Sequence, residues 1–192
     1  MRATDAIRGR RSIKRFTDRP VARAELEALL EAAALAPNHR LTQPWRFYIL
    51  GPEARYGYGL ALGARKARKM PDPSNADAVR ELRERVAEEH RALPAMIAVA
   101  VVDDPASSDQ ELRDENYAAA MMAVENLSIA AVEMGLGTHI KTGAIMADPA
   151  ARAAARVRDG ERIVAVVNVG EPAEAPPPKQ RQAARAFTTW VP

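Results

Sequence analysis

The stretch YAAAMMAVENLSIAAVEM at residues 117–134 decides the fold of this chain. It is rich in alanine and methionine, and with the residues before it predicts one long helix over 111–134, closed by Gly135 and Gly137. The helix is apolar on nearly every face, and such a helix has to be covered on every face. In a chain of 192 residues, either the chain's own core encloses it or a second subunit does, and we expect a second subunit.

Composition excludes several classes of protein. Polar residues interrupt the apolar stretch, which argues against a membrane span; they are Glu125, Asn126, Ser128 and Glu133. The N-terminus has no apolar segment of the secretory type. The chain has no cysteine, which excludes disulfides, cysteine-ligated zinc and iron–sulfur clusters and fits a reducing compartment. We therefore expect a cytoplasmic protein without a membrane partner.

The rest of the pattern predicts several helices and a few strands. Amphipathic or charged segments predict helices at residues 2–9, 22–35, 53–69, 77–93 and 148–157. Apolar runs predict strands at residues 46–50, 95–102 and 163–169. This mixture predicts an α+β fold, a single domain over residues 1–192 in which one sheet packs against helices. The helix at 77–93 is charged, so we expect His90 to be solvated.

Positive charge is concentrated in the N-terminal segment around Arg10-Arg11-Ser12-Ile13-Lys14-Arg15-Phe16. Residues 1–23 contain eight lysines and arginines and two aspartates, although the net charge of the whole chain is only +3. Arginine offers forked donors, lysine a point charge and serine a short hydrogen bond, which together suit a phosphorylated ligand. The alternative is a solvated basic segment. The aromatic residues do not interleave with these cations, so we expect no nucleic-acid partner.

No catalytic side chain or metal site stands out. The three histidines, His39, His90 and His139, lack metal-ligand spacing, and there is no nucleophile elbow or phosphate-binding loop. Polar groups gather instead in three further segments, at residues 37–45, 138–143 and 179–181. Binding groups without a nucleophile are typical of a protein whose cofactor performs the chemistry.

The order of these segments resembles the FMN-dependent nitroreductase family, particularly its short, minimal members. The resemblance spans nearly the whole chain. The matching motifs are Arg10 to Phe16, Ala36-Pro37-Asn38-His39, Gln43-Pro44-Trp45-Arg46-Phe47, Gly135-Leu136-Gly137-Thr138, Val169-Gly170-Glu171-Pro172 and Pro177-Pro178-Lys179-Gln180-Arg181. It implies a central, mostly antiparallel sheet packed by helices, and an intertwined homodimer with FMN at the subunit interface.

The resemblance also implies roles for individual residues, all of them in cofactor binding. Near the FMN phosphate and ribityl chain it places Arg10, Arg11, Ser12, Lys179 and Arg181. At the N1 and C2 carbonyl edge of the flavin ring it places Lys14. A loop reaching the flavin from the other subunit would supply Asn38, His39 and Gln43, and the segment after the long helix Ile140, Lys141 and Thr142. The chain departs from common family patterns at Asn38-His39, Ile140 and Lys141.

The implied reaction is a two-step exchange in which NADPH or NADH reduces FMN and a small-molecule acceptor is then reduced. The acceptor would be a nitroaromatic, a quinone or a related electron-poor compound. The alternatives are reductive dehalogenation, enone reduction or oxidative flavin chemistry on the same fold, or flavin binding without turnover. The physiological acceptor, the preferred nicotinamide nucleotide, the proton donor and the substrate lid stay open.

Overall fold

A four-stranded antiparallel sheet forms the centre of the computed structural model, which describes residues 1–102 and 109–192. The strand order is β1-β2-β4-β3, with β1 at Trp45–Ile49, β2 at Ala95–Val102, β4 at Glu161–Gly170 and β3 at Gly137–Lys141. The α+β fold and the three predicted strands are confirmed, with bounds that differ by at most two residues. β3 was not predicted as a strand, because it is short and alternates between apolar and polar residues.

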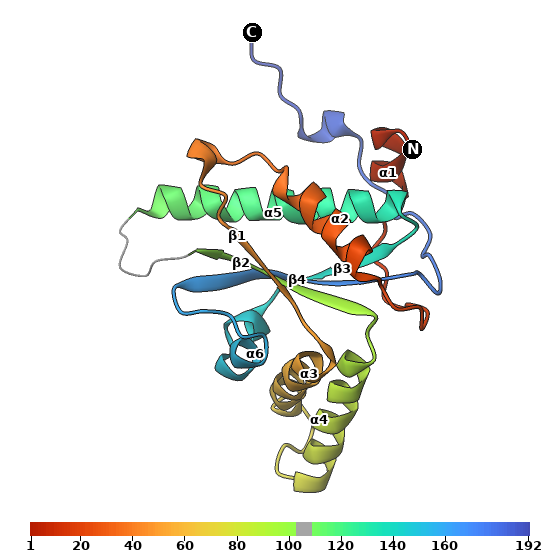
Figure 1. Ribbon diagram of the computed structural model, residues 1–192, viewed down its shortest axis with the longest axis vertical. Helices are drawn as coiled ribbons and strands as arrows, with labels where there is room; N and C mark the ends of the chain where they lie inside the picture. Colours follow the sequence, from red (N-terminus) through yellow and green to blue (C-terminus); the bar gives the residue numbers. More distant parts are fainter. Residues whose placement is uncertain (103–108) are drawn as a thin grey trace.

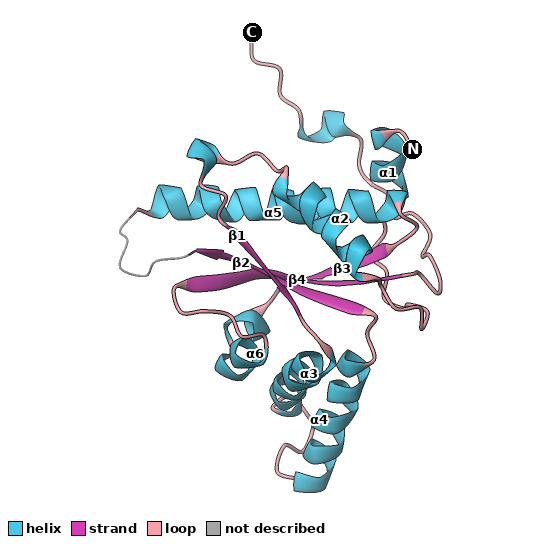
Figure 2. Cartoon of the chain, in the orientation of Figure 1, coloured by secondary structure: helices cyan, strands magenta, loops and turns pink. Residues whose placement is uncertain are grey.

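Helices cover both faces of the sheet (Figures 1 and 2). One face packs against α2, Arg23–Ala34, and α5, Gln110–Glu133. The other packs against α3, Pro52–Ala67, and α6, Pro149–Ala154, while α4, Ala76–Arg91, packs on α3. Coverage on both faces explains why the central strands β2 and β4 read as continuous apolar runs.

The long helix α5 is confirmed and runs lengthwise over one face of the sheet (Figure 1). Asp109 caps its first turn by accepting a hydrogen bond from the Leu112 amide at 2.9 Å. Gly135 ends it with a φ of 71°, a left-handed conformation that glycine adopts without strain. The prediction that Gly137 also closes the helix is wrong. Gly137 is the first residue of β3.

The chain's own core covers only part of α5. Its inward side is fully buried and consists of Ala119, Ala120, Ala123, Val124, Leu127, Ser128 and Ala131. On its outer side Tyr117 and Met122 remain 40% and 41% exposed. None of the helices in the described ranges is long and apolar enough to cross a membrane.

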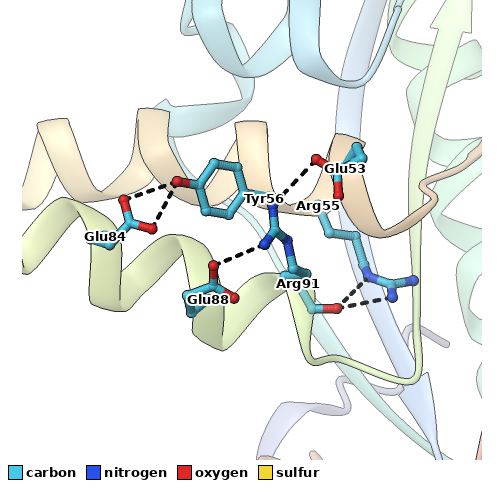
Figure 3. A network of polar contacts seen from close by, with 6 residues as sticks. All are labelled: Glu53, Arg55, Tyr56, Glu84, Glu88 and Arg91. Atoms are coloured by element: carbon cyan, nitrogen blue, oxygen red, sulfur yellow. Dashed lines mark hydrogen bonds and ion pairs between the residues drawn. The ribbon is translucent and has the colours of Figure 1, made fainter.

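Helices α3 and α4 form a tightly packed hairpin. A Cβ placed on Gly59 would lie 2.6 Å from Cα of Ala87, and one on Gly63 would lie 2.7 Å from Cα of Arg83. Figure 3 shows the polar side of this contact, where the Tyr56 hydroxyl donates to Glu84 and the Arg91 guanidinium stacks 4.1 Å above the Tyr56 ring. The glycines let the helix backbones approach, and the network holds their exposed edges together.

His90 corrects one prediction, because it is buried and not solvated. Only 5% of its surface is exposed, and it lies on α4 beside Val86 and Ala87, facing the core. Its Nδ1 atom is 2.7 Å from the Val86 carbonyl oxygen, and its ring lies 6.2 Å from that of Tyr58. Helix α4 is therefore amphipathic, with a charged outer side and a buried inner side.

The ends of the chain frame the sheet. Helix α1, Ala3–Gly9, confirms the short helix predicted at residues 2–9, and it packs near the C-terminal end of α5. Helix α6 ends at Ala154, three residues earlier than predicted. Short 3-10 turns occupy His39–Leu41, Ala144–Ala147 and Ala184–Phe187. The last residues extend away from the body, with Phe187, Trp190 and Val191 at least 76% exposed.

Candidate functional site

The basic N-terminal segment is held against the edge of the sheet by backbone pairing with β3. Ser12 forms an isolated parallel bridge with Thr138, and the Ile13 amide donates to the Thr138 carbonyl at 2.9 Å. Ile13 is buried at 3% exposure, whereas Ser12 and Lys14 on either side of it are exposed. Alternation along an extended chain therefore directs the hydroxyl and the ammonium outward.

These exposed groups line a cleft of about 510 Å³, which we call the basic cleft. The proline run 176–178 and Glu174 also line it. The structure thus brings six of the twelve predicted binding residues together in the cleft: Arg10, Arg11, Ser12, Lys14, Lys179 and Arg181. Arg8 also lines it; its signal in the sequence was only its place in the run of positive charge.

The basic cleft has more cations than the chain neutralises. The Arg10 guanidinium lies 3.4 Å from the Glu125 carboxylate, and Arg11 donates to the carbonyls of Arg8 and Arg10 at 2.6 and 2.9 Å. Within the described ranges, no carboxylate lies within 4.0 Å of the four remaining cations, which are Arg8, Lys14, Lys179 and Arg181. Glu174, a carboxylate that lines the cleft, lies 3.6 Å from Arg15. A doubly charged phosphate fits this donor set, because several unpaired cations and a hydroxyl converge on one opening.

The loop with Asn38, His39 and Gln43 is held in a strained conformation. The Asn38 side chain accepts a hydrogen bond from the Gln43 amide at 3.0 Å and donates to the Ala36 carbonyl at 3.3 Å. Three residues of the loop have left-handed φ angles, namely Arg40 at 52°, Leu41 at 54° and Gln43 at 43°. Such conformations are costly for residues other than glycine and concentrate at functional sites.

Within one chain this loop does not reach the basic cleft. The Thr42 hydroxyl donates to Asn116 near the start of α5, whereas Arg10 pairs with Glu125 in the second half of that helix. The two contacts are separated by nine residues, about 14 Å along a helix axis. Figure 1 shows the loop and α1 near opposite ends of α5. One chain by itself therefore does not bring the predicted residues of the loop and of the cleft together.

The remaining predicted residues lie on or just after β3. Ile140 packs into the core on the α2–α5 side, Lys141 is half-buried on the other side of the strand, and Thr142 is exposed. Burial lowers the pKa of Lys141, and the nearby Lys66 charge lowers it further. The pKa of His139 is lowered by burial and by Lys141 and Lys14. His139 and Lys66 therefore belong to the polar surroundings of Lys141. In the sequence, His139 stands two residues before Lys141, and this spacing places both side chains on the same side of a strand.

We find no arrangement suited to a metal ion. The described residues contain no group of three or more histidine and carboxylate side chains that could hold one. The pattern is that of an anion-binding cleft beside a sheet edge.

Comparisons with known proteins show the family of this chain. The model of the nitroreductase family matches residues 7–171. A Bacillus subtilis protein named "Putative NAD(P)H nitroreductase YfhC" is 33% identical, and the match covers 92% of this chain and 88% of that protein.

Solved structures show the same architecture. A nitroreductase-like family protein from Bacillus cereus superposes with a TM-score of 0.82 at 27% identity, over 100% of this chain and 96% of that one. A mutant of the FMN and NADPH-dependent nitroreductase NfnB from Sphigopyxis sp. strain HMH superposes with a TM-score of 0.77 at 22% identity, over 99% of both chains. The second likeness is one of fold alone.

Proposed function

Because this chain belongs to the nitroreductase family and is an oxidoreductase of the NAD(P)H nitroreductase type, we propose that it uses FMN to reduce nitroaromatics, quinones or related electron-poor acceptors. The observation that carries the proposal is the basic cleft, in which Lys14, Lys179 and Arg181 have no carboxylate partner among the described residues. FMN would supply the two-electron chemistry, taking hydride from NADPH or NADH and passing it to the acceptor.

The residues of this chain would bind the cofactor and tune it. Arg10, Arg11, Lys179 and Arg181 would hold the phosphate, with Ser12 as a hydrogen-bond donor. Lys14 would lie at the edge of the flavin ring that becomes negatively charged on reduction. A fixed positive charge there stabilises the reduced state and so raises the reduction potential.

We further propose that the protein is an intertwined homodimer whose two FMN sites each use both subunits. The proposal is supported by the separation of the Asn38–Gln43 loop from the basic cleft within one chain. It is also supported by the exposed side chains of Tyr117 and Met122 on α5 and by the apolar C-terminal arm with Phe187 and Trp190. Exposed apolar side chains of this kind often mark an interface, and a second subunit that covers them removes apolar surface from water.

Cofactor binding tests the proposed function most directly. The purified protein should bind FMN, and NADPH or NADH should bleach the bound flavin. Arg181→Gln should weaken FMN binding by about tenfold, which corresponds to about 1.4 kcal/mol. The affinity for riboflavin, which has no phosphate, should be unchanged. A wild-type protein that fails to bind added FMN would rule out the proposal.

Mixing two inactive variants tests the shared site. The double variant Lys179→Glu/Arg181→Glu should abolish FMN binding by the cleft of its own subunit. The double variant Asn38→Ala/Gln43→Ala should remove the contacts that the loop makes with the flavin. In a mixed dimer, one site combines both defects and the other combines an intact cleft with an intact loop. Unfolding and refolding the two variants together should therefore restore activity, and light scattering should show a dimer. Absence of any recovery from correctly refolded dimers contradicts the shared site.

Steady-state assays decide among the reactions that the same fold could support. We expect turnover with nitroaromatics and quinones. Faster turnover with halogenated phenols or enones would favour reductive dehalogenation or enone reduction.

A further inference from the structure

The basic cleft is built from two segments of like charge that come from opposite ends of the chain. The N-terminal segment supplies four of its lining cations and the C-terminal segment supplies the other two. Neither residues 10–19 nor residues 171–183 form a helix or a regular strand. Like charges repel each other, so contacts outside the cleft have to hold the two segments together when no anion is bound.

A short antiparallel ladder, which we call the junction, joins the two segments next to the cleft. It consists of residues 15–19 and 171–173. The Thr17 amide donates to the Glu171 carbonyl at 2.9 Å, and the Ala173 amide donates to the Arg15 carbonyl at 3.0 Å. On both strands, the residue that follows the ladder toward the cleft is one that lines it. The spacing of the cleft therefore depends directly on the junction.

The junction is packed against the end of β4. Phe16 forms an antiparallel bridge with Pro172, two residues after the last residue of β4, Gly170. A Cβ placed on Gly170 would lie 2.9 Å from Cδ1 of Phe16 and 2.9 Å from Cγ of Pro94. The absence of a side chain at Gly170 thus lets the Phe16 ring lie on the strand and ties the junction to the sheet.

The Glu171 side chain adds a second connection, from the junction to α2. Its carboxylate accepts a hydrogen bond from the Thr17 hydroxyl at 2.7 Å and lies 3.6 Å from Nε of Arg19. The same Arg19 guanidinium donates to both carboxylate oxygens of Glu25, in the first turn of α2, at 3.0 and 3.2 Å. Charge-assisted and bidentate hydrogen bonds of this kind are stronger than neutral ones and fix the geometry of their partners.

A second carboxylate, Glu174, lies three residues further along and differs from Glu171 in its surroundings. It pairs with Arg15 at 3.6 Å, and the two side chains are 60% and 74% exposed. An ion pair in that much water contributes little. Glu174 also lines the basic cleft, where its charge opposes a bound anion, whereas Glu171 does not line the cleft.

We propose that Glu171 is a positioning residue, which acts through Thr17 and Arg19 to hold the two cationic segments at the spacing that binds a phosphate group. The proposal rests on the proposed FMN-dependent function for the identity of that phosphate. It has a consequence opposite in sign to simple electrostatics. Removing a negative charge near an anion site should strengthen anion binding, but removing the Glu171 charge should weaken it, because the segments then separate.

The variant that tests the proposal is Glu171→Gln, with Glu174→Gln as its matched control. Dissociation constants for FMN and for riboflavin should be measured by flavin fluorescence. We expect Glu171→Gln to weaken FMN binding by about fivefold and to leave riboflavin binding unchanged. Glu174→Gln should instead tighten FMN binding by about twofold, since it only removes an opposing charge.

The Thr17 hydroxyl provides a rescue experiment. Thr17→Val, which has no hydroxyl to donate to Glu171, should weaken FMN binding as Glu171→Gln does. Thr17→Ser keeps the hydroxyl and should bind FMN as the wild type does. FMN binding by Glu171→Gln that equals or exceeds that of the wild type overturns the proposal. An equal loss of FMN and riboflavin affinity also overturns it, because it would show general damage to the site.

Amide hydrogen exchange gives a readout that does not depend on FMN. The Thr17 and Ala173 amides, which donate within the ladder, should exchange faster in Glu171→Gln than in the wild type, and at the wild-type rate in Glu174→Gln. If the wild type binds no FMN, the proposed function fails, and exchange still decides on the junction. Unchanged exchange of both amides in Glu171→Gln would then refute the positioning role.

Discussion

Ile13 of the basic segment packs so closely on Gly137 of β3 that a Cβ added to Gly137 would lie 2.4 Å from Cγ1 of Ile13. The same Cβ would lie 3.0 Å from Cγ of Pro172. The absence of a side chain at Gly137 therefore lets the segment pair with β3. That pairing positions Ser12 and Lys14 at the basic cleft.

Gly137→Ala should consequently displace the basic segment. We expect a loss of about 1–3 kcal/mol in the free energy of unfolding, as for other overpacked sites, together with weaker FMN binding. Urea denaturation measures the first effect and flavin titration the second. Adding Ile13→Ala removes the clashing Cγ1, so the double variant should lose less stability than the sum of the single variants. Strict additivity would contradict the proposed contact.

Lys14→Ala should lower the reduction potential of bound FMN, because the charge that stabilises the reduced ring is removed. For a two-electron couple, each 1.4 kcal/mol of lost stabilisation lowers the potential by about 30 mV. Lys14→Arg keeps the charge and serves as the control. Spectroelectrochemical titration of the FMN-loaded proteins measures the potential. A potential that is the same in all three proteins would remove Lys14 from this role.

His90 should make stability depend on pH. Burial, opposed by its contact with the Val86 carbonyl, lowers the pKa of this imidazole, and Lys141 and Lys66 lower it further. The unfolded chain then binds a proton more readily than the folded one, so stability is greatest above the unfolded value of about 6.5 and falls as the pH drops below it.

His90→Gln, which cannot titrate in this range, should reduce the acid-side fall in stability. Denaturant midpoints measured between pH 5 and 8 provide the test. His139 also has a lowered pKa, so part of the wild-type pH dependence should persist. A pH profile that is identical in wild type and variant would show that His90 does not titrate differently in the two states.

Gly59→Ala should destabilise the α3–α4 hairpin more than Tyr56→Phe, which removes a hydrogen bond from its surface network. The added Cβ would meet the backbone of α4 at Ala87, which cannot move without separating the helices. We expect a loss of about 1–3 kcal/mol in the free energy of unfolding. Tyr56→Phe removes the exposed hydrogen bond to Glu84 and should change stability little (Figure 3). Thermal unfolding of the two variants compares them directly, and the reverse order would refute the packing argument.

The local sequence was sufficient to predict the elements that consist mainly of apolar residues. The apolar runs of β2 and β4 and the alanine-rich α5 were predicted almost to the residue, because hydrophobic periodicity and helix-ending glycines are local properties. β3 could not be recognised in this way. Its five residues become a strand by pairing with β4, and two of its polar residues, His139 and Lys141, are only half-buried.

The sequence by itself determined which residue types are available: a basic segment at residues 10–15, cations at 179 and 181, and no thiol. Only the tertiary structure decided where they meet. It joined the two ends of the chain in one cleft, separated the Asn38–Gln43 loop from that cleft, and buried His90. The physical reason is that burial and the distance between remote segments follow from how helices and strands pack, and packing depends on contacts between residues far apart in the chain.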